Sequence, residues 1–180
     1  PHIPLKKTKK GVNVVLALDV SGSMKAKDYS PNRIEAAKIA ARTLIEELKP
    51  KDKVGIVIFQ SGATTASYLT SLKERALDKL SSINAKEGKT AIGDGLGLGI
   101  DMVTSIPNKK KVVILMSDGV NNAGVIKPDE AISYAKENNI QVFTVGMGSE
   151  GKTIIGRDWF GRPQYATLHE TLLQKIAQQT

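Results

Sequence analysis

Short apolar stretches rich in β-branched residues recur along the chain, and longer segments with helical periodicity separate them. The stretches do not alternate strictly between apolar and polar positions, which is typical of parallel strands covered on both faces. They are Val12–Leu18, Val54–Phe59, Val112–Met116 and Ile140–Val145. Because strands that alternate with helices require crossover connections, we predict an α/β fold with a doubly wound, Rossmann-like, mostly parallel sheet and helices on both faces.

Apolar residues three or four positions apart predict the helices. The first helix is expected to have Ser30 as its N-cap and Pro31 at its first helical position. Capping-box spacing at Ser71–Glu74 and Thr167–Glu170 predicts two further helix starts, and a proline predicts the start of a helix over 128–138. The apolar positions of the first helix are Ile34, Ala37, Ala41, Leu44 and Leu48.

Two segments depart from this regular alternation, and a third adds a strand at the edge of the sheet. Residues 91–103 keep a helical stripe although every second position from Gly93 to Gly99 is glycine. Each glycine costs about 1 kcal/mol relative to alanine in a helix interior, so we expect close backbone packing there. Residues 64–69 are predicted to add one short antiparallel edge strand. Residues 152–166 have β-prone ends around two glycines and a proline, which predicts a hairpin-like excursion from the last strand.

The length and composition predict a single domain within a longer protein. A chain of 180 residues can bury one sizeable core, and we expect a basic lead-in segment at 1–10 followed by one domain over 11–180. No apolar stretch approaches the roughly 18–20 residues that span a bilayer, and no signal-peptide pattern opens the chain. Because it begins without an initiator methionine, we expect the chain as given to be a soluble fragment of a longer protein.

The amino-acid composition also limits the kinds of site and partner that the chain can have. The absence of cysteine excludes disulfides, thiolate zinc sites and cysteine nucleophiles, and two histidines exclude a His-rich metal site. The net charge of +8 would suit a nucleic-acid partner, but only 4% of residues are aromatic and no nucleic-acid motif accompanies the charge. We therefore interpret the lysine clusters as solvated tail and loop residues and expect no nucleic-acid partner. The clusters are Lys6, Lys7, Lys9, Lys10 and Lys109–Lys111.

Carboxylates follow two of the predicted strands. Asp19 ends the run "LALD", and Asp118 comes just after "VVILMS". In an open α/β sheet, ligands bind outside the carboxyl ends of the strands, so both side chains are expected at the same edge. Two carboxylates in a partly buried crevice repel each other and raise one pKa unless a cation lies between them. A divalent metal ion is the simplest such cation.

Three hydroxyl residues complete the candidate metal site: Ser21 and Ser23 on the loop after Asp19, and Thr90 on the loop that opens the glycine-rich helix. Hard ions such as Mg²⁺ take about six oxygen ligands and readily keep water. Because hydroxyls are neutral, the protein would supply only about two negative charges. The metal would stay electrophilic, with a vacant or water-filled position that favours an acidic group from a partner.

The order Asp19-x-Ser21-x-Ser23, then Thr90, then Asp118 resembles the metal-ion-dependent adhesion site (MIDAS) of von Willebrand factor A (vWA) domains. The stretches "LALDVSGSM", "PNRIEAAK", "GKTAIGDGL", "LMSDGVNNAG" and "FGRPQYA" are similar to the aerotolerance-type (BatA-like) prokaryotic subgroup. The resemblance implies that both serines and the threonine contact the metal directly, whereas the two aspartates act largely through water. Lys89 and Val120 depart from the family pattern at the rim of the site.

The same resemblance implies Mg²⁺ as the ion, with Mn²⁺ or Ca²⁺ as alternatives, and a partner protein that presents Asp or Glu. Further partners would be other components of a membrane complex. The parent protein would be membrane-anchored, with this domain outside the cytoplasm. Family members also suggest a conformational switch that moves the last helix, here about 168–179.

Two enzymatic alternatives remain open. The run "GMGSEGKT", Gly146–Thr153, satisfies the P-loop pattern, but a phosphate-binding loop must lead into a helix, and the next residues are β-branched and broken by glycine. A metal-dependent phosphohydrolase would use a metal-bound water as its nucleophile, yet no general base beyond Asp19 and Asp118 is evident. We therefore favour a binding module over an enzyme. Trp159 and Phe160 either contact a partner or pack against the sheet.

Overall fold

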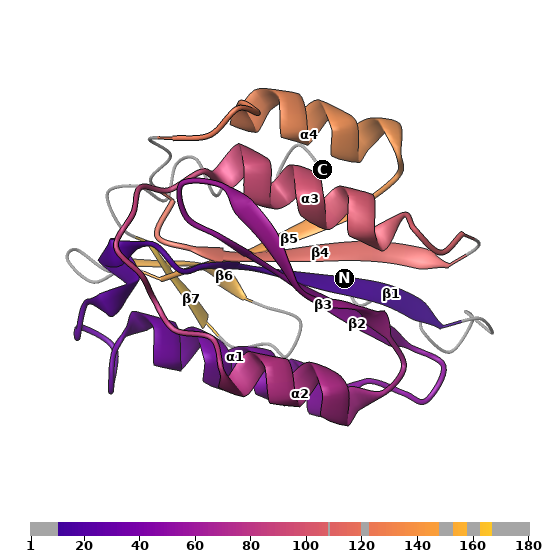
Figure 1. Cartoon of the computed structure of the whole chain (residues 1–180), viewed down its shortest axis with the longest axis horizontal. Coiled ribbons are helices and arrows are strands. Elements are labelled where there is room, and N and C mark those ends of the chain that lie inside the picture. The colour runs from indigo at the N-terminus through magenta and orange to yellow at the C-terminus, as the bar shows by residue number, and fades with distance from the viewer. Residues whose placement is uncertain (1–10, 108, 120–122, 148–152, 158–162, 167–180) are drawn as a thin grey trace.

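The computed structural model describes residues 11–107, 109–119, 123–147, 153–157 and 163–166. Its main sheet has five strands in the order β3-β2-β1-β4-β5 (Figure 1). All neighbouring pairs are parallel except β2 and β3, so the predicted mostly parallel sheet with one antiparallel edge strand is confirmed. The strands are β1 (Val12–Asp19), β2 (Lys53–Phe59), β3 (Ala63–Thr70), β4 (Lys110–Ser117) and β5 (Gln141–Gly146).

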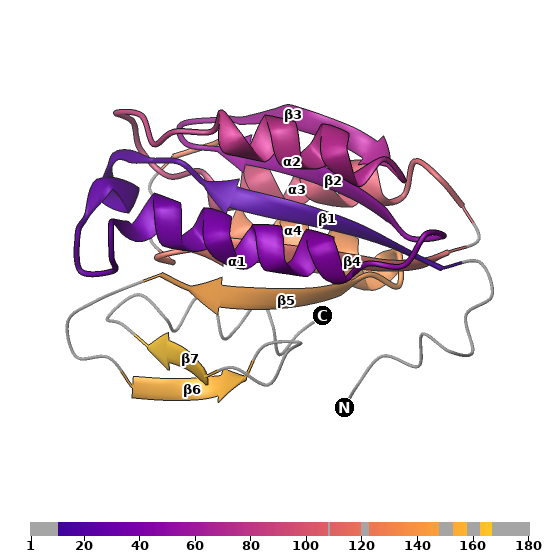
Figure 2. The same ribbon diagram turned by 90° about the horizontal axis from the view of Figure 1, so that it is seen from below.

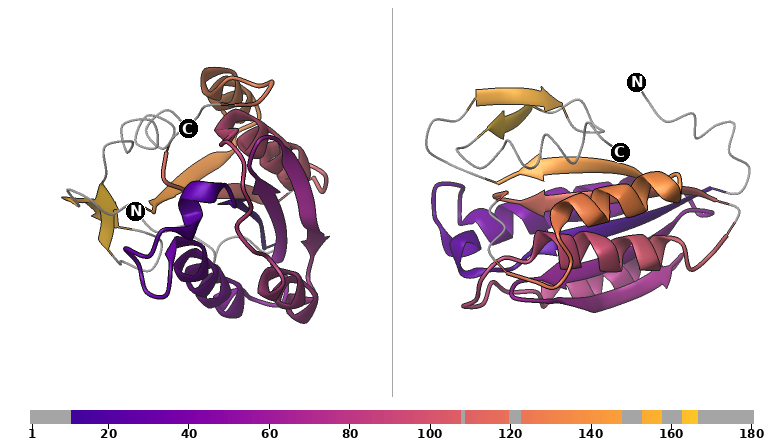
Figure 3. Two further views of the ribbon diagram at one scale, coloured as in Figure 1. Left: turned by 60° about the vertical axis from the view of Figure 1, so that its left-hand side comes forward. Right: turned by 90° about the horizontal axis from the view of Figure 1, so that it is seen from above.

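Helices cover both faces of this sheet, as predicted for a doubly wound fold (Figure 3). On one face lie α1 (Arg33–Glu47) and α2 (Lys73–Ser81), and on the other lie α3 (Ile92–Val103) and α4 (Pro128–Glu137). A short 3-10 helix, η2 (Gly22–Lys25), follows β1. Because every helix of the described part is short, none is long and apolar enough to cross a membrane.

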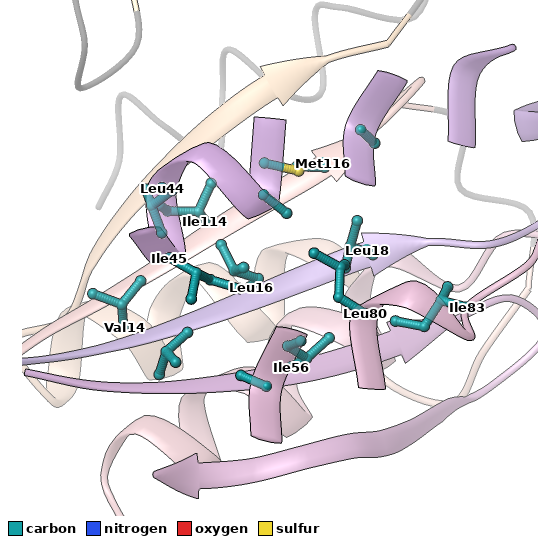
Figure 4. Packing of buried hydrophobic residues seen from close by; sticks show 14 of the residues in the cluster. Val14, Leu16, Leu18, Leu44, Ile45, Ile56, Leu80, Ile83, Ile114 and Met116 are labelled. Carbon is teal, nitrogen blue, oxygen red and sulfur yellow. The ribbon is translucent and has the colours of Figure 1, made fainter. Parts of the chain in front are cut away.

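Strand β1 contributes alternate residues to two separate hydrophobic cores. Val14, Leu16 and Leu18 pack with residues of α1 and α2, as Figure 4 shows. Val15 and Ala17 pack with residues of α3 and α4 on the opposite face. Since both faces of β1 are buried, its sequence is a continuous apolar run without polar alternation.

Two predicted helix starts were wrong. Asn32, not Ser30, is the N-cap of α1, and its side chain accepts the backbone N–H of Glu35 at 2.8 Å. Asparagine and serine are equally good N-caps, so residue preference alone could not choose between them. The N-cap of α2 is Leu72 rather than Ser71, and its N–H is held by the hydroxyl of Thr70 at 3.0 Å.

The glycine-rich helix α3 packs closely against its neighbours, as expected. A Cβ atom at Gly93 would overlap the backbone carbonyl of Ile126, and one at Gly95 would overlap the ring of Phe59. Residues larger than glycine would therefore push α3 away from β2 and from the loop before α4.

Two further strands, β6 (Thr153–Arg157) and β7 (Pro163–Ala166), form a separate antiparallel pair (Figure 2). Trp159, Phe160, the helix expected at 168–179, its capping box at 167–170 and the lysines of segment 1–10 lie outside the described residues. The departure expected at Val120 lies there too.

Candidate metal centre

The carboxyl ends of β1 and β4 bring the two predicted carboxylates to one edge of the sheet. The strands are parallel neighbours, and Leu18 pairs with Met116, so Asp19 lies beside Ser117 and close to Asp118. Figure 2 shows β1 ending at the same edge as β5, the strand on the far side of β4. The hydroxyl of Ser117 donates to Asp19 Oδ2 at 2.7 Å and accepts the N–H of Gly119 at 3.1 Å.

The turn after β1 places both serines against these carboxylates. Ser21 donates its backbone N–H and its hydroxyl to Asp19 Oδ1, at 2.9 and 2.5 Å. Ser23 donates its hydroxyl to Asp118 Oδ2 at 2.5 Å. The two serine Oγ atoms lie 3.2 Å apart. A hydroxyl has one proton, so with both protons directed at carboxylates the serine oxygens turn lone pairs toward each other.

Thr90 joins the same network from the loop before α3. Its hydroxyl donates to Ser21 Oγ at 3.0 Å. The backbone holds this loop from two sides, since Ala91 N–H donates to the carbonyl of Gln60 and Ala123 N–H donates to the carbonyl of Thr90. The structure thus brings together all five residues that the sequence singled out: Asp19, Ser21, Ser23, Thr90 and Asp118.

Burial gives the cluster a closed floor and one open side. Asp19 and Ser21 have no exposed surface, and Thr90 and Asp118 are buried as well. Ser23 is exposed to solvent. A ligand would therefore approach from the side of Ser23.

Burial raises the pKa of Asp19 from 3.8 to about 6. Hydrogen bonds from Ser21 and Ser117 lower this pKa, whereas the neighbouring charge of Asp118 raises it further. Desolvation favours the neutral form of this carboxyl group, whereas a cation beside it would favour the charged form. The site therefore favours a bound cation on electrostatic grounds.

The donor set fits a hard divalent cation. Every candidate ligand atom is a carboxylate or hydroxyl oxygen, which suits Mg²⁺, Mn²⁺ or Ca²⁺ rather than ions that prefer sulfur or imidazole. In the described part of the chain, no group of three or more His, Cys, Asp or Glu residues is placed to hold a metal ion. A metal at this edge would depend on the hydroxyls as well as on the two aspartates.

Two residues that contact the site, Ser117 and Arg33, were not predicted from the sequence. Ser117 directly precedes Asp118, yet its hydroxyl serves Asp19, and strand pairing could have revealed this proximity. Arg33, within "PNRIEAAK", places its Nη1 3.5 Å from Asp118 Oδ2. No spacing rule connects Arg33 to Asp118, because the contact depends on where α1 begins.

The P-loop alternative conflicts with the structure. Residues 148–152 are outside the described part, but Thr153–Arg157 forms strand β6. A phosphate-binding loop needs a helix immediately after the Gly-Lys-Thr sequence, with its N-terminus facing the phosphates. A strand in that place provides no such N-terminus.

Comparison with known proteins decides the family. The model of the von Willebrand factor type A domain matches residues 14–121, which is more than half of the chain. The chain belongs to this family. Among solved structures, the vWA domain is similar to an aerotolerance-related membrane protein of Bacteroides fragilis, with 31% identity and a TM-score of 0.79 over 94% of this chain and 88% of that one.

A second solved structure extends the likeness to aerotolerance-type proteins. BatB of Bacteroides thetaiotaomicron is 34% identical, with a TM-score of 0.76 over 94% of this chain and 86% of that one. The predicted resemblance to this prokaryotic subgroup is thereby supported at the level of the whole vWA domain.

A more distant vWA protein carries a metal. The proximal thread matrix protein 1 of the mussel byssus, in a structure with a zinc-occupied MIDAS motif, is 26% identical, with a TM-score of 0.67 over 76% of this chain and 35% of that one. Among curated relatives, the vWA domain spans about half of the protein it matches, 41% of the first and 52% of the second.

Proposed function

We propose that this vWA domain is a non-catalytic, divalent-cation-dependent protein–protein interaction module that captures an aspartate or glutamate of a partner. The observation that carries the proposal is the single hydrogen-bonded network that joins three loops at the carboxyl edge of the sheet. Its oxygen donors, its open side at Ser23 and its buried carboxylates are the features that such a centre requires.

Each residue of the network has a proposed role. Ser21, Ser23 and Thr90 would bind the ion through their hydroxyl oxygens, and Asp19 and Asp118 would hold water ligands and balance the charge. The ion, Mg²⁺ in the first instance, would supply an electrophilic position for a carboxylate. Ser21 and Ser23 already face each other with their lone pairs, so little rearrangement of the first loop would be needed.

A binding role is favoured over phosphate-ester hydrolysis. The network consists of Asp, Ser and Thr side chains, with Arg33 at its margin, and within the described part of the chain no separate general base joins it. Hydrolysis of a generic phosphate ester that disappears in Asp118→Asn would reverse this preference.

We also propose that the parent protein is anchored in a membrane, with this domain on the extracytoplasmic side and other components of a membrane complex as its partners. Support comes from the similar protein of B. fragilis, which is described as a membrane protein. The domain's coverage of only about half of its curated relatives leaves room for such a segment elsewhere in the parent.

Calorimetry with Mg²⁺ and Mn²⁺ tests the metal centre directly. Wild type is expected to bind one ion, and Asp19→Ala is expected to lose that binding. Asp78→Ala is the matched control, because Asp78 is an exposed residue of α2 that does not belong to the hydrogen-bonded network of the site. Ion binding that persists in Asp19→Ala would contradict the assignment.

Capture of the partner is tested with the native membrane fraction as the source. Protein recovered on immobilised wild-type domain in Mg²⁺ should be lost in chelator, restored by added Mg²⁺, absent on Asp19→Ala and retained on Asp78→Ala. Recovery that ignores both chelation and Asp19→Ala would refute the proposed mode of binding.

A further inference from the structure

The first residue of α1 is an arginine, which is unusual on electrostatic grounds. The N-terminus of a helix carries partial positive charge and therefore disfavours a cation in its first turn. Arg33 nevertheless sits at this position, directly after the N-cap Asn32. Its side chain must gain its stability from contacts other than those with the helix.

Those contacts fix Arg33 between two carboxylates. Its Nε donates to Asp28 Oδ1 at 2.9 Å, and its Nη1 lies 3.5 Å from Asp118 Oδ2. The backbone N–H of Arg33 donates to the carbonyl of Ala26 at 2.8 Å, which closes the loop between η2 and α1. Both the guanidinium and the Asp28 side chain are largely buried, so water screens these contacts less than it would at an exposed site.

The guanidinium of Arg33 and the hydroxyl of Ser23 both lie against the same oxygen atom of Asp118. Asp118 Oδ2 accepts the hydroxyl of Ser23 and is also the Asp118 oxygen that lies 3.5 Å from Arg33 Nη1. A guanidinium stays protonated at all physiological pH values, so this positive charge cannot be removed when another cation arrives. Any ion held among the hydroxyls and Asp118 therefore shares that carboxylate with a permanent charge.

We propose that Arg33 is the resident counter-cation of the metal centre: it balances Asp118 in the metal-free protein and weakens the binding of a divalent cation by repulsion. This inference rests on the proposed function and adds a rule for its regulation. The centre holds its ion weakly when the ion is alone and more tightly once an acidic ligand supplies further negative charge. Asp28 moderates the effect, because it shares the guanidinium with Asp118.

The test compares cation binding in charge variants of the full 180-residue chain. Arg33→Gln keeps a hydrogen-bond donor but removes the charge, and its dissociation constant for Mn²⁺ should fall about tenfold below that of wild type. Arg42→Gln is the matched control, since it removes the same charge roughly 13 Å further along α1. It should change the constant less than about twofold, because water and salt screen charges at that distance.

Two further variants test the direction of the expected change in Mn²⁺ affinity. Arg33→Lys keeps the positive charge and should bind Mn²⁺ within about twofold of wild type. Asp28→Asn leaves the guanidinium with less negative charge around it, so Mn²⁺ binding should weaken, by about threefold. If Arg33→Gln does not fold, Asp28→Asn carries the test, and an unchanged constant in it overturns the inference.

Thermal unfolding in chelator tests the metal-free role. Arg33→Gln should melt about 4 °C or more below wild type, because Asp118 loses its counter-charge, whereas Arg42→Gln should melt close to wild type. A chelated Arg33→Gln protein as stable as Arg42→Gln overturns this half of the inference.

The outcomes separate this inference from the proposed function. If wild type binds no divalent cation, the proposed metal centre fails, and repulsion by Arg33 fails with it. If wild type binds the ion but Arg33→Gln binds it equally or more weakly, only the counter-cation inference is overturned. Tighter binding in Arg33→Gln with no change in Arg42→Gln supports both.

Discussion

The two strand-ending carboxylates of the site, Asp19 and Asp118, have different electrostatic surroundings although they lie on neighbouring strands. Asp19 is wholly buried and accepts three hydrogen bonds, and it forms no ion pair within the described part of the chain. Asp118 accepts a hydroxyl from Ser23 and has a guanidinium 3.5 Å away. One carboxylate therefore lacks a counter-charge, and the other already has one.

This difference indicates which side of the site depends most on a metal. Without an ion, burial favours the protonated form of Asp19 and raises its pKa to about 6, although hydrogen bonds from Ser21 and Ser117 oppose this shift. Asp118 can rely on Arg33 instead. A bound ion would thus be stabilised mainly by Asp19. At Asp118 it would compete with the guanidinium of Arg33 for the same carboxylate.

The largest expected effect is a dependence of the metal-free stability on pH. The pKa of Asp19 is higher in the folded protein, about 6, than in the unfolded chain, 3.8, so the folded state binds the proton more readily. This contribution is fully present below pH 3.8 and is lost as the pH rises through about 6. In chelator, Asp19 should therefore lower the free energy of unfolding by about 2.4 kcal/mol between pH 4 and pH 7.5.

Other acidic groups also titrate in this range, so the measurement is a difference. Urea unfolding of wild type and Asp19→Asn at each pH isolates the contribution of Asp19, because asparagine does not titrate. The stability of wild type relative to the variant should fall as the pH rises. A difference that stays constant between pH 4 and pH 7.5 would mean that Asp19 has an ordinary pKa and that the comparison with Asp118 is wrong.

A second, intermediate effect should come from the packing that holds the loop after Asp118. Asp94 Oδ1 accepts the N–H groups of Val125 and Ile126, and a methyl group at Gly93 would overlap the carbonyl of Ile126. Gly93→Ala should therefore displace this loop, lower the stability by about 2 kcal/mol and weaken cation binding. Chemical unfolding and calorimetry with Mn²⁺ measure the two effects.

Gly99→Ala is the control within the same helix. A Cβ at Gly99 would meet its nearest atom, on Val113, at 3.4 Å, which is an ordinary contact. Its helix propensity should make the variant as stable as wild type or up to about 1 kcal/mol more stable. If both substitutions behaved alike, the close approach of α3 to the loop would not be what positions Asp118.

More of the candidate site itself could be predicted from the sequence than of the residues that surround it. Asp19 and Asp118 follow apolar runs, and parallel strands deliver their carboxyl ends to one edge, so periodicity alone was enough to bring them together. Thr90 could be placed because the glycine-rich helix is recognisable after it. These signals lie within short stretches of sequence, and each can be recognised without knowing which residues of neighbouring strands pair.

The surroundings of the site depend on contacts that no local pattern encodes. The pairing of Leu18 with Met116 puts Ser117 beside Asp19, and that pairing is set by the sheet as a whole. Arg33 reaches Asp118 only because α1 begins after Asn32, and the expected N-cap at Ser30 would have moved the arginine within the first turn. Because the predicted start of this helix was slightly wrong, the contact between Arg33 and Asp118 was not predicted.

The smallest expected effect best distinguishes the surroundings of Asp19 from those of Asp118. Ser117 is the chain neighbour of Asp118, but its hydroxyl donates to Asp19 Oδ2 at 2.7 Å. In Ser117→Ala, Asp19 loses a donor that favours its charged form, so its pKa should rise further above the ordinary value. In chelator at pH 7.5, the protein should lose about 1 kcal/mol of stability, and it should lose less at pH 4, where Asp19 is protonated.

Ser67→Ala supplies the background for that measurement. Ser67 is also a buried strand serine, but within the residues that the structure describes its hydroxyl makes only a long contact of 3.4 Å to a backbone carbonyl on β3. Its stability change should be the same at pH 4 and pH 7.5, because no carboxylate depends on it. If Ser117→Ala were equally insensitive to pH, the hydroxyl would act on the backbone of Gly119 alone, and Asp19 would be held by the Ser21 loop without help from β4.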